Sequence, residues 1–69
     1  MNNTTNSKPN FNTFATDVLK QQGYTKSMRR SFWRFHSGDW LPPQPFILQW
    51  NKLLADIRVQ YFNNFSLNQ

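Results

Sequence analysis

The residues with the most reactive side chains do not form a catalytic pattern in this chain of 69 residues. The chain contains one histidine (His36), three aspartates, no glutamate and no cysteine. A lone histidine near a helix end more often makes a structural hydrogen bond than performs catalysis, and aspartates scattered along the chain do not form an acid–base pair. One histidine without cysteine also does not supply the ligands of a zinc site. We therefore expect no enzyme activity, no metal and no cofactor.

Basic and aromatic residues form a second pattern, and this one indicates binding. Eight Lys and Arg stand against three acidic residues, which gives a net charge of +5, and aromatic residues make up 17% of the chain. Five of the eight cations fall between Lys20 and Arg34, and no acidic residue occurs between Asp17 and Asp39. On a helix wound at about 100° per residue, four cations fan around one side, with the indole of Trp33 among them. These cations are Lys26, Arg29, Arg30 and Arg34.

The chemistry of this helix face suits a nucleic acid. Arginine can fork to guanine or grip phosphate, and lysine makes a point-charge contact to phosphate. Hydroxyl groups near a helix N-terminus can join its backbone N–H groups around a phosphate, and an indole can stack on an unpaired base. The alternative is that Trp33 folds down with Trp40 into a secondary core while the arginines are only solvated. The predicted DNA-binding residues are Thr25, Lys26, Ser27, Arg29, Arg30, Trp33, Arg34 and Ser37.

Three helices are expected to position this face. Capping residues and glycine stops predict helices over about 11–22 and 25–37, which end before Gly23 and Gly38. A third helix is predicted over about 45–62, where apolar residues recur at helical spacing. The short glycine-containing connection between the first two helices has the length of a helix-turn-helix turn. The expected fold is therefore all-α, a small three-helix domain with a helix-turn-helix-like pair and a long C-terminal amphipathic helix.

Apolar residues at helical spacing predict the core of this domain. Each helix has one such stripe, and in the second helix the stripe lies opposite the cations. The stripes are Phe14, Val18 and Leu19 in the first helix, Met28, Phe32 and Phe35 in the second, and Phe46, Ile47, Trp50, Leu53, Leu54, Ile57 and Tyr61 in the third.

The two ends of the chain are polar. Residues 1–10 are too polar to form a buried core, so we expect a disordered N-terminal arm, followed by one helical domain over 11–65 and a tail over 66–69. The arm also contains no apolar stretch of the kind found in a secretory leader. The longest apolar run, residues 46–48, is far short of the roughly 20 residues needed to span a bilayer. We therefore expect no membrane partner and a location in the cytoplasm or in a virion made there.

Residues 30–39, with the sequence RSFWRFHSGD, and the prolines that follow at 42 and 43 resemble the recognition helix and exit turn of Cro/lambda-repressor-type helix-turn-helix regulators, especially small phage-encoded ones. The resemblance extends over about residues 29–57. The chain departs from that family in having room for one helix, where the family has two, before the recognition helix. A weaker resemblance, in GYTKS at 23–27 and in GDW at 38–40, is to excisionase-type DNA-binding proteins. The main resemblance implies that Arg30, Ser31, Trp33 and Arg34 lie at or beside the DNA groove, that Phe32 and Phe35 are buried, and that Gly38 caps the helix.

These observations favour a small sequence-specific or architectural DNA-binding protein, a transcriptional regulator of a phage or mobile element, with the helix over 25–37 in the major groove of duplex DNA. Because one small module buries little surface on DNA, we expect a homodimer formed through the helix over 45–65. Its predicted contacts are Trp50, Tyr61, Phe62 or Phe65. The alternative is a phage-type protein-interaction module that inhibits a host nucleic-acid enzyme through the same face, since Trp and Arg also dominate protein interfaces. Binding to RNA or to a single strand is a third hypothesis.

Overall fold

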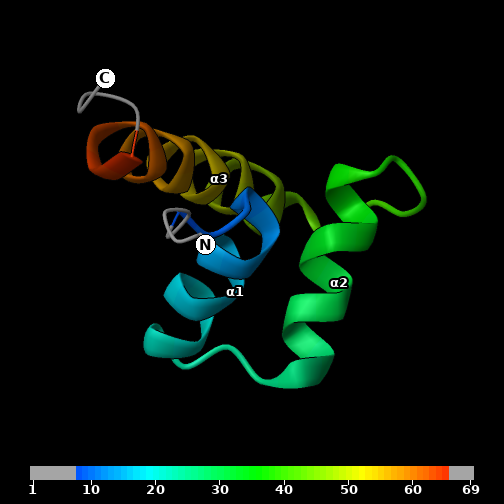
Figure 1. Cartoon of the computed structure of the whole chain (residues 1–69). Coiled ribbons are helices and arrows are strands. Elements are labelled where there is room, and N and C mark those ends of the chain that lie inside the picture. Colours follow the sequence, from blue (N-terminus) through cyan, green and yellow to red (C-terminus); the bar gives the residue numbers. More distant parts are fainter. Residues whose placement is uncertain (1–7, 66–69) are drawn as a thin grey trace.

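The computed structural model describes residues 8–65. They form three helices, α1 (Phe11–Gln21), α2 (Lys26–His36) and α3 (Gln44–Phe65), as Figure 1 shows. The predicted all-α domain with a long C-terminal helix is confirmed. The helix α3 continues to Phe65, about one turn beyond its predicted end. That extra turn is held by the Phe65 ring, whose centroid lies 5.6 Å from that of Phe14 in α1.

Side-chain caps fix where α1 and α2 begin. The Asn10 side-chain oxygen accepts a hydrogen bond from the backbone N–H of Thr13 at 2.8 Å. The Thr25 hydroxyl oxygen accepts one from the backbone N–H of Met28 at 3.2 Å. Each bond satisfies a donor that has no partner within its own helix, and such a cap is worth about 1 kcal/mol.

Glycines with positive φ fix where the same two helices end. The φ angles of Gly23 and Gly38 are 89° and 88°, in the left-handed region that a side chain disfavours. After Gly23, the N–H of Tyr24 donates to the carbonyl of Leu19 at 3.0 Å, and after Gly38 the N–H of Asp39 donates back into α2 at 3.0 Å. Both endings are Schellman motifs. The two turns that orient α2 are therefore determined by residues close to them in the sequence.

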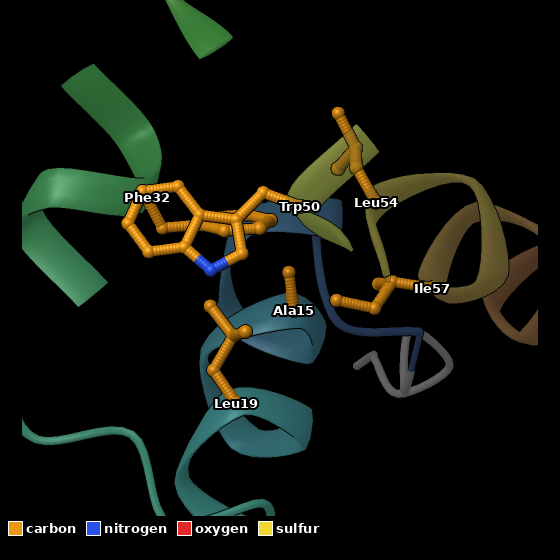
Figure 2. Close-up of a cluster of buried hydrophobic side chains, with 6 residues drawn as sticks. All are labelled: Ala15, Leu19, Phe32, Trp50, Leu54 and Ile57. Atoms are coloured by element: carbon orange, nitrogen blue, oxygen red, sulfur yellow. The ribbon is translucent and has the colours of Figure 1, made fainter. Parts of the chain in front are cut away.

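The core lies where the three helices meet (Figure 2). Phe32 is the contribution of α2, and it is fully buried. Its ring lies 5.7 Å from that of Trp50 in α3 and 6.4 Å from that of Tyr24, centroid to centroid. The buried residues of this core cluster are Ala15, Leu19, Phe32, Trp50, Leu54 and Ile57.

Contacts of α2 with α3 are concentrated in the C-terminal half of α2. The Phe35 ring lies 6.2 Å from the Trp50 ring, and the His36 imidazole is hydrogen-bonded to the Trp50 carbonyl. Met28 lies one turn before Phe32, and its side chain is 42% exposed. The prediction that Met28 packs inward with Phe32 is therefore wrong, because the part of α2 that meets α3 begins only after Met28.

The segment before α1 is attached to the far end of α3. The Tyr61 hydroxyl donates to the Pro9 carbonyl at 2.8 Å, and the Lys8 ammonium lies 5.6 Å from the centroid of the Tyr61 ring. Residues 8–10 of the predicted arm therefore contact the domain. Residues 1–7 of that arm, and the predicted tail over 66–69, lie outside the described residues.

Candidate functional site

The outward side of α2 carries a row of three cations. Lys26, Arg30 and Arg34 are all exposed and follow one another at intervals of four residues. At about 1.5 Å per residue, this row is about 12 Å long. The α2 sequence contains no acidic residue, and the helix lies along one edge of the molecule (Figure 1). We call Lys26, Arg30 and Arg34 the basic ridge.

Arg29 differs from the three ridge cations. It is half-buried, and its guanidinium donates a hydrogen bond of 2.8 Å to the backbone carbonyl of Tyr24. Arg29 lies three residues before Phe32, so it projects toward the inner side of α2 and reaches the turn after α1. One of its donors is thus already used inside the fold. The structure separates Arg29 from the free cations with which the sequence grouped it.

Trp33 is half-buried and packs against the core. Its ring lies 5.1 Å from the Phe32 ring at an interplanar angle of 84°. The indole predicted to lie among the cations is therefore only partly exposed, because the side of α2 that carries Trp33 also faces the body of the domain. Trp33 and Trp40 also do not form the secondary core that was the alternative, because the Trp40 ring lies 6.3 Å from the Trp50 ring, centroid to centroid.

The remaining predicted residues are hydroxyls at the two ends of α2. Thr25 uses its hydroxyl oxygen as the N-cap of α2, and Ser27 in the first turn is exposed. The Ser37 hydroxyl donates to the backbone carbonyl of Arg34 at 3.1 Å. All three side chains are exposed, so the unused lone pairs of their oxygens face water.

A groove of about 500 Å³ lies beside the basic ridge. It is formed by the first turn of α1, the C-terminal half of α2 and the middle of α3. Its lining residues are Phe11, Asn12, Trp33, His36, Ser37, Leu54 and Arg58.

Of the seven lining residues, only Trp33 and Ser37 were predicted as site residues, and Arg58 is the charged one that sequence reasoning missed. The pattern of α3 placed it on the polar side of its own helix, away from the predicted interface. In the fold, α2 packs across α3 and brings Trp33, His36 and Arg58 around one groove. A weak signal existed: Arg58 directly follows the buried Ile57, about 100° around the helix, which puts it at the margin of the core face.

His36 has a structural role at the back of the groove. Its Nε2 lies 3.2 Å from the Trp50 carbonyl, and its ring lies 4.5 Å from that of Phe32. Burial lowers the pKa of His36 below 6.5; the Trp50 carbonyl acts in the opposite direction, and the charge of Arg58 lowers the pKa further. The prediction of a hydrogen-bonding histidine is confirmed.

No family model, no curated protein and no solved structure matches the chain. Within residues 8–65, no cluster of three or more histidine or acidic side chains is placed to hold a metal ion. None of the helices in this part of the chain is long and apolar enough to cross a membrane.

Proposed function

We propose that the protein binds duplex DNA through the basic ridge, with α2 lying in the major groove. The observation that carries this proposal is the row of three exposed cations on a helix that contains no acidic residue. The major groove of B-DNA, about 12 Å wide, accommodates an α-helix. Lys26, Arg30 and Arg34 then face the phosphates and base edges, where arginine is the most common reader of guanine.

Regulation of transcription in a phage or mobile element is the biological role we propose for this binding. It is supported by the resemblance of residues 29–57 to Cro/lambda-repressor-type regulators. Two features of that stretch fit the resemblance: Phe32 is buried, and Gly38 ends α2 with a positive φ. Phe35, which the resemblance also implies is buried, is half-buried. Arg30 and Arg34, which the resemblance implies lie at or beside the DNA groove, are exposed.

A second copy of the chain is the partner that we propose for α3. Trp50 is buried, while Tyr61 and Phe65 are half-buried near α1, so only Phe62 of the predicted dimer contacts is exposed. Phe62 belongs to a row of exposed side chains on the side of α3 away from the core. The row is Leu48, Ala55, Val59 and Phe62, and its three large members are 79%, 57% and 55% exposed. Intervals of seven, four and three residues are typical of paired helices.

Sedimentation of the protein at rising concentration tests the dimer. The wild type is expected to self-associate, and the double change Leu48→Asp with Val59→Asp is expected to give a monomer. Leu41→Asp is the matched control, because Leu41 is equally apolar and 73% exposed but lies before α3. A wild type that stays monomeric, or a control that dissociates as fully as the double variant, would contradict the proposal.

Charge-matched variants test the DNA contact. The ridge variant carries Lys26→Gln, Arg30→Gln and Arg34→Gln, and the control carries Lys8→Gln, Lys20→Gln and Lys52→Gln. All six side chains are exposed, so both variants are expected to fold, and both lose three positive charges. In anisotropy titrations with random duplex DNA at about 50 mM salt, the ridge variant should lose at least tenfold more affinity than the control. Equal losses, or a wild type that does not bind, would refute the proposal.

The alternative function, inhibition of a host nucleic-acid enzyme, is favoured by the exposure of Met28. Its side chain lies on the opposite side of α2 from the basic ridge, so the helix offers an exposed apolar contact in addition to its cations. Met and Arg are both enriched at protein interfaces. If the wild type does not bind DNA, the ridge becomes the expected contact with an acidic host protein.

A further inference from the structure

The groove beside the basic ridge has the features of a ligand site. Its volume of about 500 Å³ lies within the range of roughly 300–1,000 Å³ that is usual for small-molecule sites. Rings and an aliphatic side chain supply most of its lining, and a few polar groups lie among them. The apolar lining is Phe11, Trp33, Leu54 and the ring of His36, and the polar lining is Asn12, Ser37 and Arg58.

Trp33 gives this groove a fixed aromatic surface. The Phe32 ring lies nearly perpendicular to it, and Phe32 itself is fully buried, so the indole is held from the core side. The neighbouring His36 ring is anchored by the Trp50 carbonyl. Rings that are held in place suit stacking with a planar ligand, because little side-chain freedom is lost when the ligand binds.

The positive charge around the groove favours a planar ligand that is also anionic. Arg58 lines the groove, and the ridge residues Arg30 and Arg34 lie three positions before and one position after Trp33 on α2. In the described part of the chain, the groove lining includes no aspartate. Asn12 and Ser37 can donate and accept hydrogen bonds at the edge of a heterocycle. A nucleotide combines the planar ring, the polar edge and the negative charge that these groups suit.

We propose that the groove holds one unpaired nucleobase of a DNA strand, stacked on Trp33 with its phosphate at Arg58, while the neighbouring phosphates follow the basic ridge. This inference rests on the proposed binding of DNA by the ridge. It makes the preferred target a DNA in which one base is bulged or flipped out of the stack.

Three short DNA probes of the same sequence test the site in anisotropy titrations. The first is a fully paired duplex, the second carries one bulged adenine, and the third has an abasic residue in place of that adenine. The bulged duplex is expected to bind about tenfold more tightly than the paired duplex, because stacking of one base on an aromatic side chain increases affinity by about that factor. The abasic bulge is expected to bind like the paired duplex, because it has no base to stack on Trp33 and so nothing that brings its phosphate to Arg58.

Arg58→Gln is expected to remove most of the preference for the bulged adenine and to leave affinity for the paired duplex unchanged. Lys52→Gln is the matched control, an exposed cation of the same helix that does not line the groove. The Trp33 indole N–H resonance should shift with the bulged probe and stay in place with the abasic probe. Equal affinity for all three probes would overturn the base site while leaving the ridge proposal intact. Binding of the bulged probe alone would support the base site and refute duplex binding, and failure to bind any probe would refute both.

Discussion

Replacing Phe32 with alanine is expected to destabilise the fold far more than replacing Met28, although both residues belong to the same predicted stripe of α2. Phe32 is fully buried, and its ring contacts those of Tyr24, Trp33 and Trp50. Removing such a ring leaves a cavity between all three helices. The loss of transfer energy and the cavity together cost about 3–5 kcal/mol.

The corresponding loss at Met28 is expected to be much smaller. Its side chain is 42% exposed, so about half of the roughly 1.5–3 kcal/mol for full burial is at stake. A chain of 69 residues has a total stability of about 3–10 kcal/mol at the usual value per residue. Phe32→Ala therefore brings the domain close to unfolding, while Met28→Ala should leave it folded with a loss of about 1 kcal/mol.

Urea unfolding followed by helical circular dichroism measures both losses. Phe32→Leu, which keeps much of the apolar volume, provides a folded variant if Phe32→Ala does not fold, and its loss should still exceed that of Met28→Ala. If the Phe32 and Met28 variants lost the same free energy of unfolding, with the same slope against urea concentration as the wild type, α2 would not dock through its C-terminal half.

Two further predictions concern the contacts of Trp50. The pKa of His36 is lowered in the folded state, so in mild acid the unfolded chain binds more protons than the folded chain. The free energy of unfolding should therefore be greatest above pH 6.5 and decrease as the pH falls from there through the lowered pKa of His36. Urea titrations from about pH 7.5 to about pH 5 check this, and a decline that persists unchanged in His36→Gln would assign it to another group. The Trp50 indole N–H donates to the Tyr24 hydroxyl at 3.1 Å, so Tyr24→Phe should cost about 1–2 kcal/mol by leaving that donor without its partner. Urea unfolding of Tyr24→Phe measures this cost, and a stability equal to that of the wild type would mean that water replaces the hydroxyl.

The helices and their ends could be predicted from the sequence because the signals that set them are local. Thr25 caps α2 through a backbone N–H only three residues away, and Gly23 and Gly38 occupy positions that require positive φ. These interactions depend on neighbours along the chain and not on the packing of the helices. Phe32 could also be predicted as a core residue, because it lies at the centre of the apolar stripe of α2.

The composition of the candidate site could not be predicted in the same way, because it depends on how the helices cross. Arg29 finds the Tyr24 carbonyl, and Trp33 packs on Phe32, only after α2 has docked. Arg58 joins the groove from a helix whose own pattern gave it no role. A helical wheel treats each helix alone, so it groups residues by direction and does not show which ones meet a neighbouring helix.

The salt dependence of duplex DNA binding decides whether the basic ridge contacts phosphate. Each cation that neutralises a phosphate contributes about −0.9 to the slope of log affinity against log salt, so three ridge cations predict a slope of about −2.7 between about 50 and 200 mM salt. Arg34→Gln should reduce the slope to about −1.8, and the control Lys52→Gln should leave it at about −2.7. Absence of binding, or the same slope in both variants, would contradict the role proposed for α2.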